Sequence, residues 1–69
     1  MNKPYTLVAV VNGIDLPSKR YNTYQEAFGA MSRLMDNFHL QLSDEYSVGD
    51  ERVFRMEQYR SWFHIQRDL

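Results

Sequence analysis

The chain has 69 residues and no cysteine, so it is long enough for one small domain, residues 1–69, and has no disulfide or thiolate chemistry. Hydrophobic residues make up 43% of it and charged residues 25%, a composition typical of a globular domain. The formal net charge of −1 disfavours a dedicated nucleic-acid binder, because phosphate neutralisation supplies most of the affinity in that class.

Targeting signals are not apparent in the sequence. No apolar stretch approaches the roughly 20 residues that span a bilayer, and the N-terminal segment has no small-residue cleavage site. The lack of cysteine suits a reducing compartment. We therefore expect a cytoplasmic location with no membrane contact.

The first predicted element is a β-hairpin over residues 5–17. Asn12 and Gly13 lie between two apolar runs and tolerate the positive φ that a two-residue type I′ turn requires. The register set by this turn puts two sets of side chains on opposite faces, namely Leu7, Ala9 and Val11 on one and Thr6, Val8 and Val10 on the other. Because the first strand is apolar on both faces, we expect it inside the sheet, whereas Pro17 marks the second strand, residues 14–21, as an edge or bulged strand.

The next predicted element is an amphipathic helix that begins after Thr23 and ends near His39. Thr23 and Glu26 have the spacing of a capping box, which stabilises a helix start by about 1 kcal/mol. At 100° per residue, the apolar side chains fall within one arc of about 160°. They are Tyr24, Ala27, Phe28, Ala30, Met31, Leu34, Met35 and Phe38. Such a helix is expected to cover one face of a sheet.

Residues 41–51 are polar and acidic and contain one glycine, which predicts a loop or short turn. The segment does not match an EF-hand calcium-binding loop that starts at Asp44. Tyr46 and Val48 occupy positions that require oxygen ligands, and Arg55 occupies the position of the bidentate glutamate. The two histidines are far apart in the sequence and there is no cysteine, so the ligand spacing of a zinc site is also missing. We expect no metal.

The last segment is ambiguous. β-branched and aromatic residues favour a strand pair, residues 52–59 and 61–69, which turns near residues 59–61. No Gly, Pro, Asn or Asp supports a tight turn there, so one long strand and a helix remain alternatives. With the strand pair, the sequence predicts an α+β fold of order ββαββ, a single antiparallel sheet with the helix on one face.

Signatures of catalysis are missing from the sequence. Neither His39 nor His64 lies in a recognisable catalytic setting, and the three glycines are isolated rather than part of a phosphate loop. We therefore expect no enzymatic activity and no cofactor.

Charge is unevenly distributed near the C-terminus. Four acidic residues give residues 44–51 a charge of −4, while four arginines against Glu57 give residues 52–67 a charge of +3. Either the two segments offset each other, or the basic strands present a face with aromatic rings to a partner. On the sheet face that the helix leaves open we expect Val8, Val10, Trp62 and Tyr59, with Arg60 and Arg67 at its edge.

The candidate partner-binding residues combine arginine with aromatic rings. They are Arg55, Tyr59, Arg60, Trp62 and His64. Trp, Tyr and Arg are enriched at the energetic centres of protein interfaces, and they also stack on unpaired bases. The first functional hypothesis is a non-enzymatic protein-interaction module that binds a protein partner or a second copy through the open face or an edge strand. The alternative is a weak single-stranded nucleic-acid binder.

Overall fold

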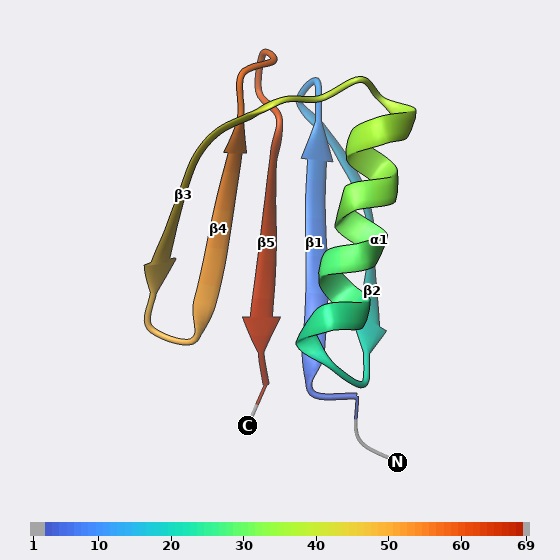
Figure 1. Ribbon diagram of the computed structural model, residues 1–69, viewed down its shortest axis with the longest axis vertical. Helices are drawn as coiled ribbons and strands as arrows, with labels where there is room; N and C mark the ends of the chain where they lie inside the picture. Colours follow the sequence, from blue (N-terminus) through green and yellow to red (C-terminus); the bar gives the residue numbers. More distant parts are fainter. Residues whose placement is uncertain (1–2, 69) are drawn as a thin grey trace.

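The computed structural model describes residues 3–68, which form one five-stranded antiparallel sheet and one helix (Figure 1). The elements in chain order are β1 (Tyr5–Val11), β2 (Ile14–Tyr21), α1 (Tyr24–Asn37), β3 (Leu42–Val48), β4 (Glu51–Met56) and β5 (Trp62–Arg67). In space the strands follow the order β2-β1-β5-β4-β3, so the first and last strands pair in the middle of the sheet. The predicted α+β class, with a hairpin, a helix and a C-terminal strand pair, is confirmed. Leu69, at the end of the predicted last strand, lies outside the described residues.

The N-terminal hairpin forms as predicted. Asn12 and Gly13 have φ values of 53° and 78°, and Val11 pairs with Ile14 directly across the turn. β1 is an inner strand and β2 an edge strand, as expected. The pairing of β1 with β2 shifts register between Leu7 and Ala9, opposite the part of β2 that contains Pro17. The shift is explained by Pro17, which has no backbone N–H and so cannot donate a hydrogen bond to the neighbouring strand.

The prediction of a loop over residues 41–51 was wrong. Leu42–Val48 is strand β3, and Gly49, with a φ of 59°, turns the chain into β4. Every residue of β3 is exposed, because the strand lies at the far edge of the sheet and the helix does not cover it. The polar and acidic composition of the segment led to the loop prediction, because a strand that is solvated on both faces can be built mostly of polar residues.

The helix begins where the capping residues predict. The Thr23 hydroxyl accepts a hydrogen bond from the Glu26 amide at 3.1 Å, while the Glu26 carboxylate accepts from the Asn22 amide at 3.2 Å. The last helical residue is Asn37, and Phe38 caps the helix C-terminus. His39 follows with a φ of 56°, a left-handed conformation that ends the helix.

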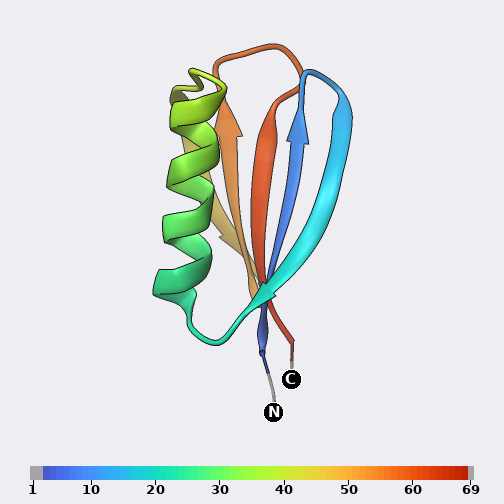
Figure 2. The same ribbon diagram turned by 90° about the vertical axis from the view of Figure 1, so that its right-hand side faces the viewer.

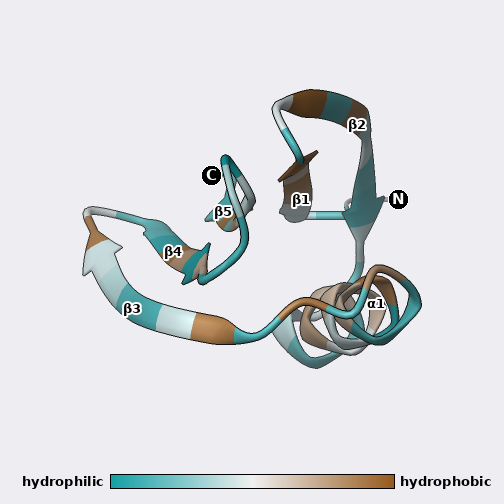
Figure 3. Cartoon of the chain, turned by 90° about the horizontal axis from the view of Figure 1, so that it is seen from above, coloured by the Kyte–Doolittle hydropathy of each residue, from teal (hydrophilic) through white to brown (hydrophobic). Residues whose placement is uncertain are grey.

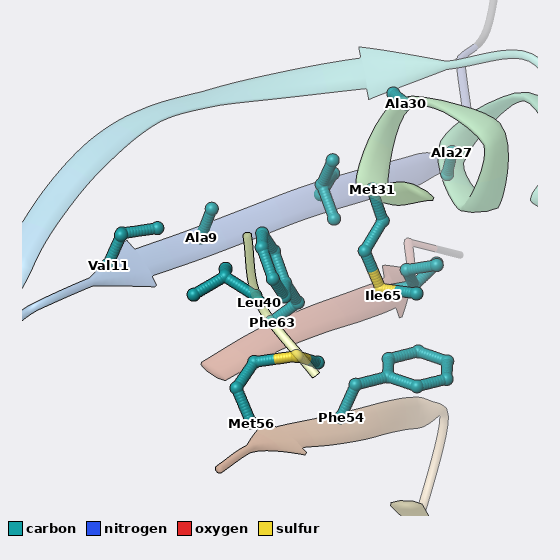
Figure 4. Packing of buried hydrophobic residues seen from close by; sticks show 11 residues of the cluster. Ala9, Val11, Ala27, Ala30, Met31, Leu40, Phe54, Met56, Phe63 and Ile65 are labelled. Carbon is teal, nitrogen blue, oxygen red and sulfur yellow. The ribbon is translucent and has the colours of Figure 1, made fainter. Parts of the chain in front are cut away.

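The core lies between α1 and the sheet. The helix packs along β1, β2 and β5 (Figure 2). The Phe28 ring reaches the Phe54 ring of β4 at 5.8 Å between centroids. The buried cluster comprises Leu7, Ala9, Val11, Ala27, Ala30, Met31, Leu40, Phe54, Met56, Phe63 and Ile65 (Figure 4). Viewed from above, α1 lies on one side of the sheet, and no other helix or strand in residues 3–68 covers the opposite side (Figure 3). Within residues 3–68 no helix is both long enough and apolar enough to cross a membrane.

The β4–β5 turn forms without glycine or proline because the neighbouring hairpin holds it. Arg60 adopts a positive φ of 48°, and its carbonyl accepts a hydrogen bond from the Gly13 amide at 2.9 Å. Ser61, which is buried, accepts from the Asn12 amide at 3.1 Å and donates to the Tyr59 carbonyl at 3.2 Å. The two turns at this end of the sheet are therefore tied together.

Ser61→Ala is expected to destabilise the protein by about 1 kcal/mol, because it leaves the partly buried Asn12 amide without its acceptor. Urea unfolding followed by circular dichroism measures the effect. Ser47→Ala, on the exposed edge strand β3, is the matched control and should change the free energy of unfolding by less than about 0.5 kcal/mol. Equal effects of the two substitutions would show that the link between the turns contributes nothing.

Candidate functional site

The candidate site lies on the sheet face opposite α1, here called the open face. The strand register assigns to it the side chains of Thr6, Val8, Val10, Asp15, Arg20, Asp44, Tyr46, Val48, Glu51, Val53, Arg55, Trp62, His64 and Gln66. Solvent-facing sides of antiparallel sheets are usually polar. Here Tyr46, Val48 and Trp62 expose 43%, 57% and 36% of their surface. Apolar surface of this kind is what a binding partner could cover.

A hollow of about 150 Å³ lies within the open face, at β3, β4 and β5. Its lining residues are Tyr46, Val53, Arg55, Trp62 and His64. Val53 is buried, with 6% of its surface exposed, and it pairs with Tyr46 on one side and His64 on the other. Arg55 pairs with Trp62 across β4 and β5. The hollow therefore has an aliphatic residue at its centre, with the rings of tyrosine, tryptophan and histidine and one guanidinium around it.

The imidazole of His64 is held by Glu51. Its Nδ1 lies 2.8 Å from the Glu51 carboxylate, to which it donates a hydrogen bond. The hydrogen bond from His64, followed by one from Gln66, lowers the pKa of Glu51 below its ordinary value, against a smaller opposing effect of burial. The pair orients the His64 ring beside the hollow.

Glu51→Gln is expected to make the protein less sensitive to acid. Because the pKa of Glu51 is lowered in the folded state, its carboxylate contributes stability above the ordinary glutamate value, and this contribution is lost as pH falls through the folded-state pKa. The wild type should therefore lose more free energy of unfolding than the variant between about pH 5 and about pH 3. Urea titrations at each pH measure the difference. Glu57→Gln, outside the regular strands, is the control, and identical pH profiles for Glu51→Gln and wild type would contradict the role of the pair.

Of the residues predicted from sequence, Arg55, Trp62 and His64 come together in the hollow. Tyr59 and Arg60 do not line it, because they lie in the β4–β5 turn beyond the strand ends. There the Arg60 guanidinium stacks over the Tyr59 ring at 5.2 Å, and Tyr59 is 71% exposed.

Sequence reasoning missed Tyr46 and Val53 as part of the site. Tyr46 lies in the segment that was predicted to be a loop, and Val53 becomes a lining residue only because β3 pairs with β4. A signal was present, since Tyr46 and Val48 alternate with polar residues and are followed by Gly49-Asp50, a pair typical of two-residue hairpin turns.

The four arginines of residues 52–67 do not form one basic surface. Arg52 points to the helix side of the sheet and forms an ion pair with Glu45, which raises the pKa of Arg52. The prediction that Arg67 edges the open face was wrong, because Arg67 pairs with Tyr5, a residue packed against the core, and so also lies on the helix side. Of the four, only Arg55 lies on the open face. The Arg52–Glu45 ion pair is one contact through which the charges of the acidic and basic segments neutralise each other, as one of the two interpretations predicted.

Known proteins offer no guide to the chemistry of this surface. Comparison of the chain found no matching family model, no matching curated protein and no matching solved structure. Within residues 3–68 no group of three or more His, Cys, Asp or Glu side chains is placed to hold a metal ion. The side chains of the open face themselves therefore provide the basis for a functional proposal.

Proposed function

We propose that the protein is a non-enzymatic protein-interaction module that associates with a second copy of itself through the open face. The observation that carries this proposal is the hollow at β3, β4 and β5. There, exposed aromatic rings surround a buried valine on a sheet face that no other helix or strand of residues 3–68 covers. Its volume of about 150 Å³ suits a protein side chain, since pockets for small molecules usually measure about 300–1,000 Å³.

The residue types support an energetic centre for binding. Trp62 and Tyr46 are large rings that lose little conformational freedom when they are covered, and Arg55 beside Trp62 can donate hydrogen bonds within a partly desolvated contact. Val48, which is also exposed, extends this apolar area toward the β3–β4 turn. Sheet-on-sheet packing is a common way for two such faces to bury each other.

Charge favours a second copy as the occupant. The open face carries Arg55 together with Asp44 and Glu51, so both signs of charge are present. A surface that meets itself across a two-fold axis requires such self-complementarity.

The edges of the sheet are less suitable for association than the face. β2 carries Pro17, a register shift and two adjacent basic residues, while β3 carries Asp44, Glu45 and a register shift. Proline, charge and irregular pairing are the features by which edge strands avoid pairing with other chains. The sequence allowed association through the open face or through an edge strand, and these features favour the open face.

The second candidate function, weak binding of single-stranded nucleic acid, is favoured by one observation. Arg55 lies directly across from Trp62, an arrangement in which a base could stack on the indole while the guanidinium contacts a phosphate. The dispersal of Arg52, Arg60 and Arg67 away from the open face weighs against it.

Analytical ultracentrifugation of the full chain over a concentration series tests the proposal. A concentration-dependent rise in mass from 8.3 kDa to twice that value is expected, with a blue shift of Trp62 emission over the same range. A constant mass of 8.3 kDa up to millimolar concentration would overturn self-association. In a parallel titration, the fluorescence anisotropy of labelled single-stranded DNA and RNA at low and physiological salt tests the second candidate, which predicts affinity that falls steeply as salt rises.

A further inference from the structure

A second concavity lies on the other side of the sheet, between the edge strand β2 and α1. It is a groove of about 420 Å³, within the range of small-molecule sites, and it shares no lining residue with the hollow of the open face. Leu7 and Ala9 of β1 line it together with Leu16 of β2 and Ala30 and Leu34 of α1. The groove therefore runs along the core itself.

Small side chains are the reason that the groove exists. Ala9 and Ala30 have side chains that end at Cβ, whereas the neighbouring core residues Met31 and Phe63 have large side chains (Figure 4). Leu16 and Leu34 are only partly buried because nothing in residues 3–68 fills the space between them. Protein cores are normally packed as densely as crystals of small organic molecules. The side chains that line an apolar groove of this volume therefore lack van der Waals contacts that a ligand could supply.

The charged groups of the groove are of one sign. Lys19 of β2 and Arg33 of α1 line it from opposite walls, and none of its lining residues is acidic. Within residues 3–68 neither side chain forms an ion pair. By contrast, the neighbouring Arg20 is bound to Asp68.

We propose that this groove binds a single-chain amphiphilic carboxylate, such as a medium-chain fatty acid. The alkyl chain lies on the aliphatic lining from β1, β2 and α1, while the carboxylate lies between Lys19 and Arg33. A guanidinium binds a carboxylate through two parallel hydrogen bonds, and the ammonium adds a second positive charge. The volume of the groove suits one alkyl chain rather than the two chains of a membrane lipid. This proposal uses the helix side of the sheet and does not depend on the proposed self-association.

The probe for this proposal is decanoate below the concentration at which it forms micelles, with decanol and decyltrimethylammonium as neutral and cationic analogues. Two-dimensional ¹⁵N–¹H NMR spectra of the full chain follow binding residue by residue. We expect saturable shifts of amides at Leu16, Lys19, Ala30 and Leu34, with affinity for decanoate roughly tenfold or more above that for decanol. Trp62 emission should stay unchanged, because the indole lies on the opposite face.

Variants separate the roles of charge and shape. Lys19→Gln combined with Arg33→Gln should abolish the preference for decanoate over decanol, whereas Lys3→Gln combined with Arg60→Gln removes the same charge outside both concavities and should preserve it. Ala30→Leu should fill the groove, raise the thermal midpoint and abolish the decanoate shifts. The two glutamine variants change only exposed side chains and should therefore fold. They test the role of charge in the groove even if Ala30→Leu fails to fold.

Three results would overturn the proposal. The first is equal affinity of the wild type for decanoate and decanol. The second is a decanoate preference that survives in the Lys19→Gln, Arg33→Gln variant. The third is a set of shifts that map to the open face instead of the groove.

Discussion

Phe63→Ala is expected to remove a large share of the protein's stability. The Phe63 side chain is fully buried, with 0% of its surface exposed, and it lies on β5 between Ala9 of β1 and Phe54 of β4. Truncation of a buried phenylalanine costs about 3–5 kcal/mol, because the apolar contacts are lost and a cavity remains. At about 0.05–0.15 kcal/mol per residue, a chain of 69 residues has only about 3–10 kcal/mol of total stability.

Urea unfolding monitored by circular dichroism tests this expectation, with addition of a stabilising osmolyte to recover a folded baseline if the variant is unfolded in buffer. Phe38→Ala is the matched control, because Phe38 is 45% exposed at the end of α1. The control should lose much less stability than the variant. A loss below about 1.5 kcal/mol for Phe63→Ala would mean that the core closes around the missing ring and that β5 is not the centre of the fold.

The parts of the fold that could be predicted are those with local signals. Asn12 and Gly13 specify the first turn through their backbone conformations, and Thr23 with Glu26 specifies the start of α1 through hydrogen bonds within one helical turn. The alternation in β5 places Phe63 in the core and Trp62 on the open face, because side chains alternate along any strand. These features depend on a few neighbouring residues and on no distant contact.

The features that sequence reasoning missed depend on contacts between distant segments. β3 is stabilised by its pairing with β4 and not by burial, so only the short alternation at Tyr46 and Val48 marks it in the sequence. The β4–β5 turn is supported by the backbone of Asn12 and Gly13, which are nearly fifty residues away in sequence. Tyr46 entered the candidate site for the same reason, since its place beside Val53 follows from the position of β3 in the sheet.

The number of elements explains why one face of the sheet remains open. One helix of 14 residues covers the side that carries Phe54, Phe63 and Ile65, and no second helix is present in residues 3–68. A sheet with a single covering layer is normally polar on its other side. The open face departs from this norm at Tyr46, Val48 and Trp62, and self-association would remove this apolar surface from water.

Trp62→Ala is therefore expected to weaken the proposed self-association by about thirtyfold or more while the fold stays intact. Interface tryptophans at energetic centres commonly contribute about 2 kcal/mol or more, and 1.4 kcal/mol corresponds to a factor of ten in Kd. The fold should survive because Trp62 is 36% exposed and lies outside the buried cluster between sheet and helix. Sedimentation equilibrium gives the Kd, and the thermal midpoint by circular dichroism reports on the fold.

Tyr59→Ala is the matched control for this substitution. Tyr59 is the more exposed aromatic residue, but it lies in the β4–β5 turn and does not line the hollow, so its loss should change Kd little. If both variants weaken association equally, general surface hydrophobicity rather than the hollow drives it. Unfolding of Trp62→Ala would instead make the indole part of the core, and an unchanged Kd would place the contact between copies away from the open face. A Kd that rises only in Trp62→Ala, with an unchanged thermal midpoint, would assign the binding energy to the ring that lies across from Arg55.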